Sequence, residues 1–382
     1  MAKGIVVTRQ SSERILLNDF VAQWREVGAD AQAALARVGE SGWLILGREV
    51  KSFEAELAAA CQVPHVVGCA SGLDAIEIAL RVLGIAPGDK VITTPLSAFA
   101  TTLAIVRSGG VPVFVDVDGS GLIDLESVAH ALSRDRSIKF CVPVHLYGHA
   151  LDAQALQRIA ALPGVQLVED CAQAIGAQSR GKAVGTIGAA AATSFYPTKN
   201  LGALGDGGAL FTRTADLAAQ AQCLRDYGQS AKYVHARLGM NSRLDELQAA
   251  ILRTALLPRL PQFTARRQAI AQKYRAGLEN PALALPHVPD GSSSVWHLFP
   301  VLVDGPRQEL IAHLDRAGIG SAVHYPTLIP DQPALAHVRF ERLGSLTMAQ
   351  RFAESELSLP IHPYLSDAQV ERVIAACNDW TP

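Results

Sequence analysis

Residues 89–118 read DKVITTPLSAFATTLAIVRSGGVPVFVDVD, and this stretch predicts a strand, a helix and a second strand in succession. Val91–Thr94 and Val111–Val117 are short and rich in β-branched residues, which favour strands. Ala98–Arg107 lies between them and has the apolar spacing of a helix. A helix that joins two such strands is typical of a parallel βαβ unit.

The same alternation continues on both sides of this unit, from about residue 50 to residue 215. The further segments are predicted as helices at Val50–Ala60, Leu73–Leu83, Leu125–Leu132 and Ala153–Leu162, and as strands at Ile138–Val144 and Gln166–Glu169. Most of these strands lack a regular alternation of polar and apolar residues, as expected when helices cover both faces of a sheet. We therefore expect an α/β fold with a mostly parallel sheet.

The pattern changes after Arg213, where helices follow one another. They are predicted at Asp216–Tyr227, Arg243–Leu257 and Ala265–Leu278. From Val295 onward, the strand-like WHLFPVLV and SAVHY alternate with helical segments that begin at Arg307 and Asp367. We expect a large domain over residues 1–255 and a smaller α+β domain over residues 256–382, with an N-terminal segment that can pack on the small domain.

Composition excludes several classes of protein. The chain has 382 residues, 49% of them hydrophobic, and its net charge is −2 from 34 basic and 36 acidic residues. Such a chain is not disordered, and it lacks the basic excess of a nucleic-acid-binding protein. No stretch approaches the ~20 apolar residues of a membrane span, and the N-terminal MAKGIVVTRQSSER has no signal-peptide core. The six cysteines form no C-x-x-C pair, so we expect free thiols in a cytoplasmic protein and no metal site.

Two segments carry groups that suit an anion and a cation. Ala70–Asp74 (ASGLD) opens a predicted helix, and its small residues would let backbone N–H groups approach an anion. A simple Ser71 N-cap explains the same residues. Leu167–Asp170 (LVED) is a strand that ends in carboxylates, at the sheet edge where parallel α/β proteins bind ligands. Asp170 could pair there with a cationic ring nitrogen, or it could cap the next helix.

Lys199 lies in SFYPTKNLGALGDGG (Ser194–Gly208), at a junction of strand and loop among apolar and small residues. Burial lowers the pKa of a lysine and so favours Schiff-base chemistry. A surface lysine beside a glycine-rich turn is the alternative. The segment has no G-x-x-x-x-G-K-[ST] pattern, which argues against a nucleotide-binding P-loop.

Two further segments have an ordinary structural explanation as well as a functional one. Phe99 follows a strand and could stack on a flat ring, or it could belong to the core. Gly239–Ala250 (GMNSRLDELQAA) contains the N-cap types Asn241 and Ser242, which predict a capped helix.

The order of these groups favours one kind of site. An anion-binding loop, an aromatic residue, a strand-end aspartate and a lysine follow one another as pyridoxal phosphate requires. The phosphate needs a helix N-terminus, the ring a flat cover, the pyridine nitrogen an anion, and the aldehyde an amine.

The sequence resembles the DegT/StrS-type sugar aminotransferases, which are fold-type-I enzymes dependent on pyridoxal 5'-phosphate. The resemblance runs from about Leu17 to Ala376. It rests on ILGREVKSFEAELA, ITTPLSAFATTLAIV, PVFVDVD, PVHLYGH, VEDCAQAIGA, SFYPTKNLGALGDGGA and GMNSRLDELQAAIL. It implies a mostly parallel seven-stranded sheet between helices, a smaller C-terminal domain and a homodimer with a shared active site.

The resemblance also implies a role for single residues. Lys199 would bond covalently to the cofactor and shuttle a proton. The other cofactor contacts implied are Asp170 at the ring nitrogen, Gln173 near the 3-oxygen, Phe99 on the ring, Ser194 with the backbone of Gly72 and Leu73 at the phosphate, and Asn241 at the phosphate of the neighbouring subunit. Many members carry threonine where this chain has Leu73, so one hydroxyl contact is lost. A related branch that dehydrates sugars has histidine at the lysine position, and Lys199 therefore favours transamination.

The implied reaction moves an amino group from L-glutamate to a nucleotide-linked ketosugar, with pyridoxamine 5'-phosphate as the intermediate form of the cofactor. The pattern resembles most the members that act on C3 of a dTDP-3-keto-6-deoxyhexose. Two alternatives are aminotransferases, one acting on C4 of a nucleotide sugar and the other on a cyclitol ketone. The remaining alternatives are an enzyme with other pyridoxal phosphate chemistry and a non-catalytic regulatory protein of the same fold. The candidate substrate contacts are Tyr196, Tyr233, His324 and Tyr325.

Overall fold

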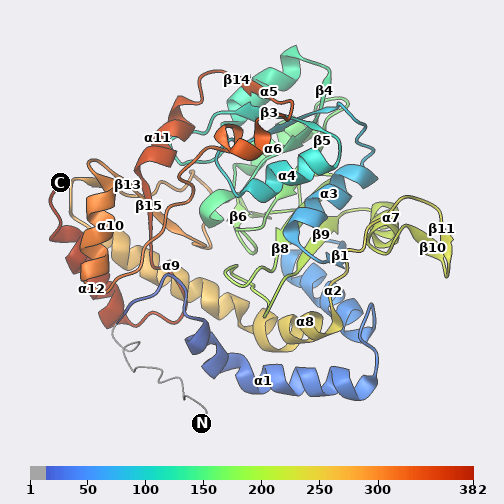
Figure 1. Ribbon diagram of the computed structural model, residues 1–382, viewed down its shortest axis with the longest axis horizontal. Helices are drawn as coiled ribbons and strands as arrows, with labels where there is room; N and C mark the ends of the chain where they lie inside the picture. The colour runs from blue at the N-terminus through green and yellow to red at the C-terminus, as the bar shows by residue number, and fades with distance from the viewer. Residues whose placement is uncertain (1–13) are drawn as a thin grey trace, which may run out of the picture.

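The structure is a computed structural model that describes residues 14–382, and its centre is an eight-stranded sheet (Figure 1). The strand order is β1 (His65–Cys69), β9 (Gly208–Thr212), β8 (Ala190–Ser194), β5 (Gln166–Asp170), β4 (Ile138–Val142), β2 (Lys90–Thr93), β3 (Val111–Val115) and β14 (Glu341–Leu343). Strand β9 runs antiparallel to both of its neighbours, and the remaining pairs are parallel. The mostly parallel α/β sheet expected from the sequence is confirmed.

The seven expected strands are joined by an eighth. Strand β14 comes from the C-terminal part of the chain and pairs with β3 through Glu341, Arg342 and Leu343. The short ERL segment has no run of β-branched residues, so its sequence gives little strand signal.

Helices cover both faces of the sheet. The helices are α1 (Phe20–Ser41), α2 (Arg48–Cys61), α3 (Gly72–Val82), α4 (Phe99–Arg107), α5 (Leu125–Arg134), α6 (Ala153–Ala160) and α7 (Ala215–Arg225). Along β8, Ala191 packs in the apolar cluster beneath α1 and α2, while Ala190 and Ala192 pack in the cluster beneath α3. Successive side chains of one strand are therefore buried on opposite faces, which explains the missing polar alternation.

A second, three-stranded antiparallel sheet lies toward the C-terminus. It contains β12 (Leu283–Ala284), β13 (Phe299–Val303) and β15 (Glu356–Leu359). It shares an apolar core with α9 (Leu260–Gly277), α10 (Arg307–Arg316) and α12 (Asp367–Asn378). Helix α11 (Thr347–Ser355) instead places Phe352 in the core of the large sheet. The two sheets are thus tied together by β14 and α11.

The remaining elements are short. Helix α8 (Glu246–Ile251) continues through one π-helical and one 3₁₀ turn into α9, and the hairpins are β6–β7 (Gln178–Ser179, Lys182–Ala183) and β10–β11 (Gln229–Ala231, Val234–His235). The segment SAVHY, expected as a strand, contributes only one bridge between Ala322 and Ser358. In the described part of the chain, no helix is long and apolar enough to cross a membrane.

Candidate active site

Asp170 is the last residue of β5 and lies at the carboxyl end of the sheet. Its Oδ2 accepts a hydrogen bond from Thr101 Oγ1 at 2.8 Å, and its Oδ1 accepts one from the Ala172 N–H at 3.0 Å. The carboxylate is almost completely buried. Burying a charge without a partner is costly, so these donors and a nearby cation are what allow it to stay there.

Lys199 lies in the loop that follows β8 and is partly buried. The loop is tight because the Lys199 N–H donates to the Tyr196 carbonyl at 2.8 Å. A Cβ at Gly202 would lie 2.3 Å from the Pro197 oxygen, so the turn accepts only glycine there. Burial lowers the pKa of the Lys199 amine to about 8, although the charge of Asp170 opposes this. Within residues 14–382, Nζ has no hydrogen bond or ion pair, which leaves the amine available for chemistry.

The expected phosphate loop forms the N-terminus of α3. Ser71 caps this helix by accepting a hydrogen bond from the Asp74 N–H. The first N–H groups of a helix have no partner within the helix and attract anions. Gly72 lies so close to Ser194 that a Cβ would come within 2.7 Å of the serine Cβ. The structure thus brings Ser194 and the backbone of Gly72 and Leu73 together.

Ser242 supports this loop instead of capping the helix that follows it. Its Oγ accepts a hydrogen bond from the Ala70 N–H at 3.1 Å and donates one to Asp74 at 2.8 Å. Helix α8 begins only at Glu246, with Asp245 as its N-cap. The capped helix expected around Asn241 and Ser242 therefore starts later than the sequence indicates.

Gln173 connects two tyrosines beside the site. Its Oε1 accepts a hydrogen bond from the Tyr147 N–H at 2.7 Å, and its Nε2 donates one to the Tyr325 hydroxyl at 3.2 Å. Burial raises the pKa of Tyr325 to about 12. The Tyr147 hydroxyl donates to the carbonyl of His324 at 2.8 Å. Of the candidate substrate residues, Tyr325 is therefore held by Gln173 and His324 by Tyr147.

The segment before β13 anchors the lysine loop. The Asn200 amide donates to the Val295 carbonyl at 2.9 Å, and its oxygen lies 3.2 Å from His297 Nδ1. Burial, together with the charge of Lys199, holds the pKa of His297 well below its usual range. A neutral imidazole next to Lys199 adds no positive charge to the site.

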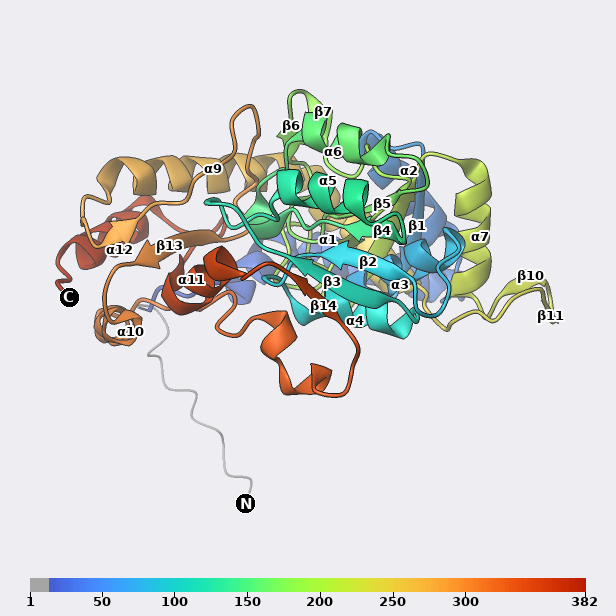
Figure 2. The same cartoon turned by 90° about the horizontal axis from the view of Figure 1, so that it is seen from above.

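Phe99 begins α4 and is partly buried against the core of the large sheet. Three expected residues have exposed side chains, although the backbone of Tyr196 bonds to Ser194 and Lys199. Tyr196 is 52% exposed, Asn241 is exposed, and Tyr233 is 81% exposed. Tyr233 lies at the turn of the β10–β11 hairpin, which projects from the body of the molecule in both views (Figures 1 and 2). A single chain does not bring Tyr233 to the site.

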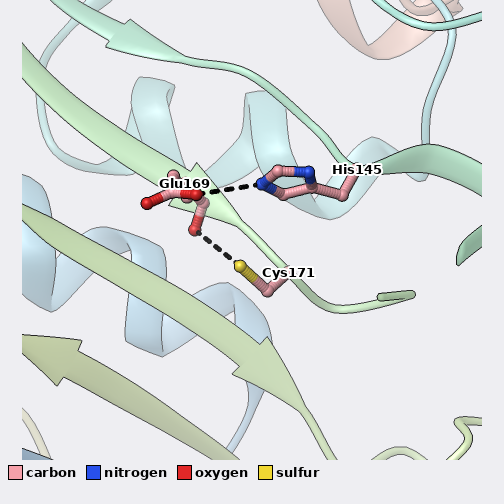
Figure 3. A group of neighbouring side chains, drawn as sticks. All are labelled: His145, Glu169 and Cys171. Carbon is pink, nitrogen blue, oxygen red and sulfur yellow. Dashed lines mark hydrogen bonds and ion pairs between the residues drawn. The ribbon is translucent and has the colours of Figure 1, made fainter. Parts of the chain in front are cut away.

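One cluster has the residue types of a metal site but the bonding of a structural anchor (Figure 3). His145 Nε2 lies 3.1 Å from Glu169, while its Nδ1 accepts from the Leu151 N–H. Glu169 also accepts hydrogen bonds from three backbone N–H groups, those of Gly185, Ile187 and Gly188. Burial would raise the pKa of Glu169, but the bonds to His145 and these N–H groups lower it. The lone pairs of His145 and Glu169 that would bind a metal are therefore already in use. The third member, Cys171, donates its thiol to the Glu169 carbonyl, and burial raises the pKa of this thiol well above its usual value.

Sequence reasoning missed this anchor and also missed Thr101. The signal was present, because Glu169 and Asp170 follow one another on a strand and must point to opposite sides. Since Asp170 faces the site, Glu169 faces away from it and has to find partners within the protein. Thr101 could have been found as a hydroxyl in the first turn of the helix that begins at Phe99.

A model of the DegT/DnrJ/EryC1/StrS aminotransferase family matches residues 25–378. The chain belongs to this family. It is 44% identical over 376 residues, 98% of each chain, to the dTDP-3-amino-3,4,6-trideoxy-alpha-D-glucose transaminase of Streptomyces venezuelae. Membership and this similarity identify the protein as a sugar aminotransferase.

Two solved structures are also similar. DesV of S. venezuelae in complex with a ketimine intermediate has a TM-score of 0.92 and 44% identity, covering 97% of this chain and 99% of that chain. NtdA of Bacillus subtilis with bound cofactor PMP has a TM-score of 0.86 and 28% identity, and the match covers 97% of this chain and 85% of that chain. The aminotransferase fold expected from the sequence is confirmed.

The site of this aminotransferase has the groups that pyridoxal phosphate requires. A buried carboxylate at Asp170, a partly buried amine at Lys199 and a helix N-terminus approached closely by Ser194 lie at one end of the sheet. A side chain at Gly72 would fill the cradle at the helix N-terminus, and glycine leaves it open for an anion.

Proposed function

We propose that this aminotransferase moves an amino group from L-glutamate to C3 of a dTDP-linked 3-keto-6-deoxyhexose, using pyridoxal 5'-phosphate. The observation that carries the chemistry is the partly buried Lys199 amine beside the buried Asp170 carboxylate. The kind of sugar and the carbon that is aminated are inferred from the similarity to the S. venezuelae transaminase, which is named for a dTDP-linked 3-amino sugar.

When bound, pyridoxal phosphate supplies an aldehyde that carries the amino group and a ring that accepts electrons. Asp170 holds a negative charge for a ring N–H, and Thr101 and Ala172 fix its orientation. The N–H groups of Gly72 and Leu73 and the Ser194 hydroxyl would hold the phosphate. Phe99 would cover the ring, and Gln173 would lie near the 3-oxygen.

Lys199 serves as both acid and base at Nζ. Its lowered pKa of about 8 leaves a useful fraction of neutral amine at neutral pH, whereas an ordinary lysine is almost fully protonated. A catalytic group works best when its pKa is near the working pH.

The Lys199→Ala variant tests this proposal. It should lose the visible absorption of the lysine-bound cofactor and transfer no amino group to a dTDP-3-ketosugar. Lys182→Ala, which removes an exposed lysine, is the control and should behave like the wild type. Amination by Lys199→Ala at the wild-type rate would contradict the assignment, and comparison of 3-keto with 4-keto sugars and cyclitol ketones tests the carbon.

We also propose a homodimer in which Asn241 reaches the phosphate of the neighbouring subunit. Large apolar side chains are exposed at several places in the described chain, and two of these places contain very exposed ones. Trp43 and Leu44 are 63% and 55% exposed after α1, and Leu238 is 93% exposed beside the β10–β11 hairpin. Exposed apolar patches usually mark a binding surface. A second copy would cover them and could bring Tyr233 to the substrate.

We further propose the division into domains at residues 1–255 and 256–382. The separate apolar core of the three-stranded sheet supports it, although β14 and α11 pack on the large sheet. A cytoplasmic location is supported by the six cysteines, all of which are free thiols.

A further inference from the structure

A carboxylate that the proposed chemistry does not use lies in β15, behind the candidate substrate residues. Glu356 is completely buried, and so is Ser358 two residues further along the strand. Alternate residues of a strand point to the same side, so the two side chains lie next to each other. A buried acid in this position requires an explanation, because an apolar side chain would fill the space at lower cost.

The bonds of Glu356 lead to His324. Its Oε1 lies 2.5 Å from Ser358 Oγ, and Ser358 Oγ lies 2.9 Å from His324 Nδ1. Its Oε2 accepts a hydrogen bond from the His324 backbone N–H at 2.5 Å. The backbone on both sides is fixed, because the Ser358 N–H donates to the Ala322 carbonyl at 2.8 Å.

His324 is partly buried and lies close enough to Lys199 for the lysine charge to affect it. Burial, assisted by that charge, lowers the pKa of His324 to about 4. The imidazole is therefore neutral at neutral pH, with one nitrogen as donor and the other as acceptor. Which nitrogen carries the proton depends on the bond that the other nitrogen makes.

We propose that Glu356 and Ser358 form a buried relay that sets the tautomer of His324, and through it decides whether Nε2 accepts or donates a hydrogen bond to the sugar. This inference rests on the proposed function, since it assigns His324 to the ketosugar. Glu356 and Ser358 are positioning residues that act through His324.

The two states of the relay follow from its connectivity. With Glu356 ionised, Ser358 donates to Glu356, His324 Nδ1–H donates to Ser358, and Nε2 carries a lone pair. With Glu356 protonated, the carboxyl donates to Ser358, Ser358 donates to Nδ1, and Nε2 carries the proton. A proton taken up at Nε2 therefore moves the Nδ1 proton to Ser358 and the serine proton to Glu356. The reverse transfers, from Glu356 through Ser358 to His324, release the proton from Nε2 again, and no other reactant is needed.

Both states are accessible near neutral pH. Burial raises the pKa of Glu356 to about 8, against the lowering effects of Ser358, the His324 N–H and Arg307. Arg307 donates to the backbone carbonyls of Ala353 and Glu356, at 2.7 and 3.0 Å, and makes no hydrogen bond to the Glu356 carboxylate. The other titratable groups that face this region are Lys199, His297, Tyr147 and Tyr325. His297 stays neutral because burial and the neighbouring positive charges hold its pKa well below its usual range. The two tyrosine hydroxyls stay neutral because burial raises the pKa of both.

The tautomer can be measured on the substrate-free holoenzyme with ¹⁵N-labelled histidine, by long-range ¹H–¹⁵N correlation. The His324 signals are assigned from their loss in His324→Gln. We expect the Nε2–H form to give way to the Nδ1–H form as pH rises through about 8. In Glu356→Gln this change should disappear. A His324 tautomer that is independent of pH in the wild type, or unchanged in Glu356→Gln, overturns the proposal.

A double-mutant cycle tests the path to the sugar. Ser358→Ala should slow the ketosugar half-reaction by about 100-fold, the lower end of the range that general acid–base catalysis contributes, and leave the glutamate half-reaction nearly unchanged. In the His324→Gln background, Ser358→Ala should have no further effect, because residues that act through one another are not additive. Ser358→Thr, which keeps the hydroxyl, should restore the rate.

Leu357→Val perturbs the same strand without touching the relay, and it should alter neither half-reaction nor the tautomer. Additive effects of His324→Gln and Ser358→Ala overturn the proposal. If Ser358→Ala does not fold, Glu356→Gln takes its place in the cycle. Failure of the wild type to aminate any ketosugar would instead contradict the proposed function, and the tautomer measurement would still decide the relay.

Discussion

At the scale of single residues, the environment of Lys199 matters more than its place in the sequence. The same amine on the surface would be protonated at neutral pH. Partial burial lowers its pKa to about 8, while the negative charge of Asp170 raises it again. The net value reflects the competition between the loss of water and the attraction of an anion.

This competition predicts the pH dependence of Lys199 reactivity. Only the neutral amine reacts with an amine-specific reagent, so labelling of the apoprotein at Lys199 should rise with pH and reach half its maximum near pH 8. In Asp170→Asn the anion that favours the protonated form is gone, so the midpoint should move to lower pH. Peptide mass mapping of the adduct gives the rates.

The control for this experiment is Asp304→Asn, which removes an exposed carboxylate and should leave the midpoint unchanged. A midpoint close to that of an ordinary lysine, or an upward shift in Asp170→Asn, would show that the site does not tune this amine.

At the scale of secondary structure, contacts between distant elements complete the helix ends. Glu246, the first residue of α8, accepts hydrogen bonds from the N–H groups of Gly47, Glu49 and Val50 at the start of α2. The N-cap of α2 is Gly47, which has no side chain to do this. A carboxylate 199 residues away therefore takes the place of a local cap.

Glu246→Ala should lower the free energy of unfolding by about 2 kcal/mol, because it leaves buried N–H groups without acceptors. Urea unfolding followed by circular dichroism measures the change. Glu126→Ala is the matched control, since its carboxylate is 79% exposed in a pair with Arg158. That variant should change stability by less than about 0.5 kcal/mol. Equal losses in the two variants would disprove the capping role of Glu246.

At the scale of the whole molecule, two residues of the proposed site are exposed on the surface of the single chain. Asn241 is exposed, and Tyr233 lies on a hairpin at the edge of the molecule. If each subunit completes the site of its partner, two inactive variants can restore each other.

Lys199→Ala and Asn241→Ala, each inactive alone, should regain activity when they are unfolded together and refolded. Half of the dimers would be mixed, and one of two sites in each would be intact, so about a quarter of the wild-type activity is expected. The sedimentation coefficient measures whether the refolded protein is a dimer. Mixing the two variants without exchange of subunits is the control, and no gain after refolding would show that Asn241 does not serve the partner.

The sequence by itself determined the α/β class and the chemical types at the site. Strand and helix periodicities are local, so the segments from residue 89 to residue 118 could be interpreted without knowing their neighbours. The pair formed by Asp170 and Lys199 could also be found, because strand ends of a parallel sheet meet at one edge. A strand was expected before Lys199, but the bounds of β8 were not predicted, since AAATS consists mainly of small residues whose burial comes from the strands on either side.

Only the tertiary structure decided which partners complete these elements. The relay from Glu356 through Ser358 to His324 joins residues 34 positions apart, and the cap of α2 comes from α8. Such contacts depend on which distant segments fold next to each other, and the local sequence pattern does not indicate this. The physical reason is that a buried charge or N–H group must find a partner somewhere, and packing decides where.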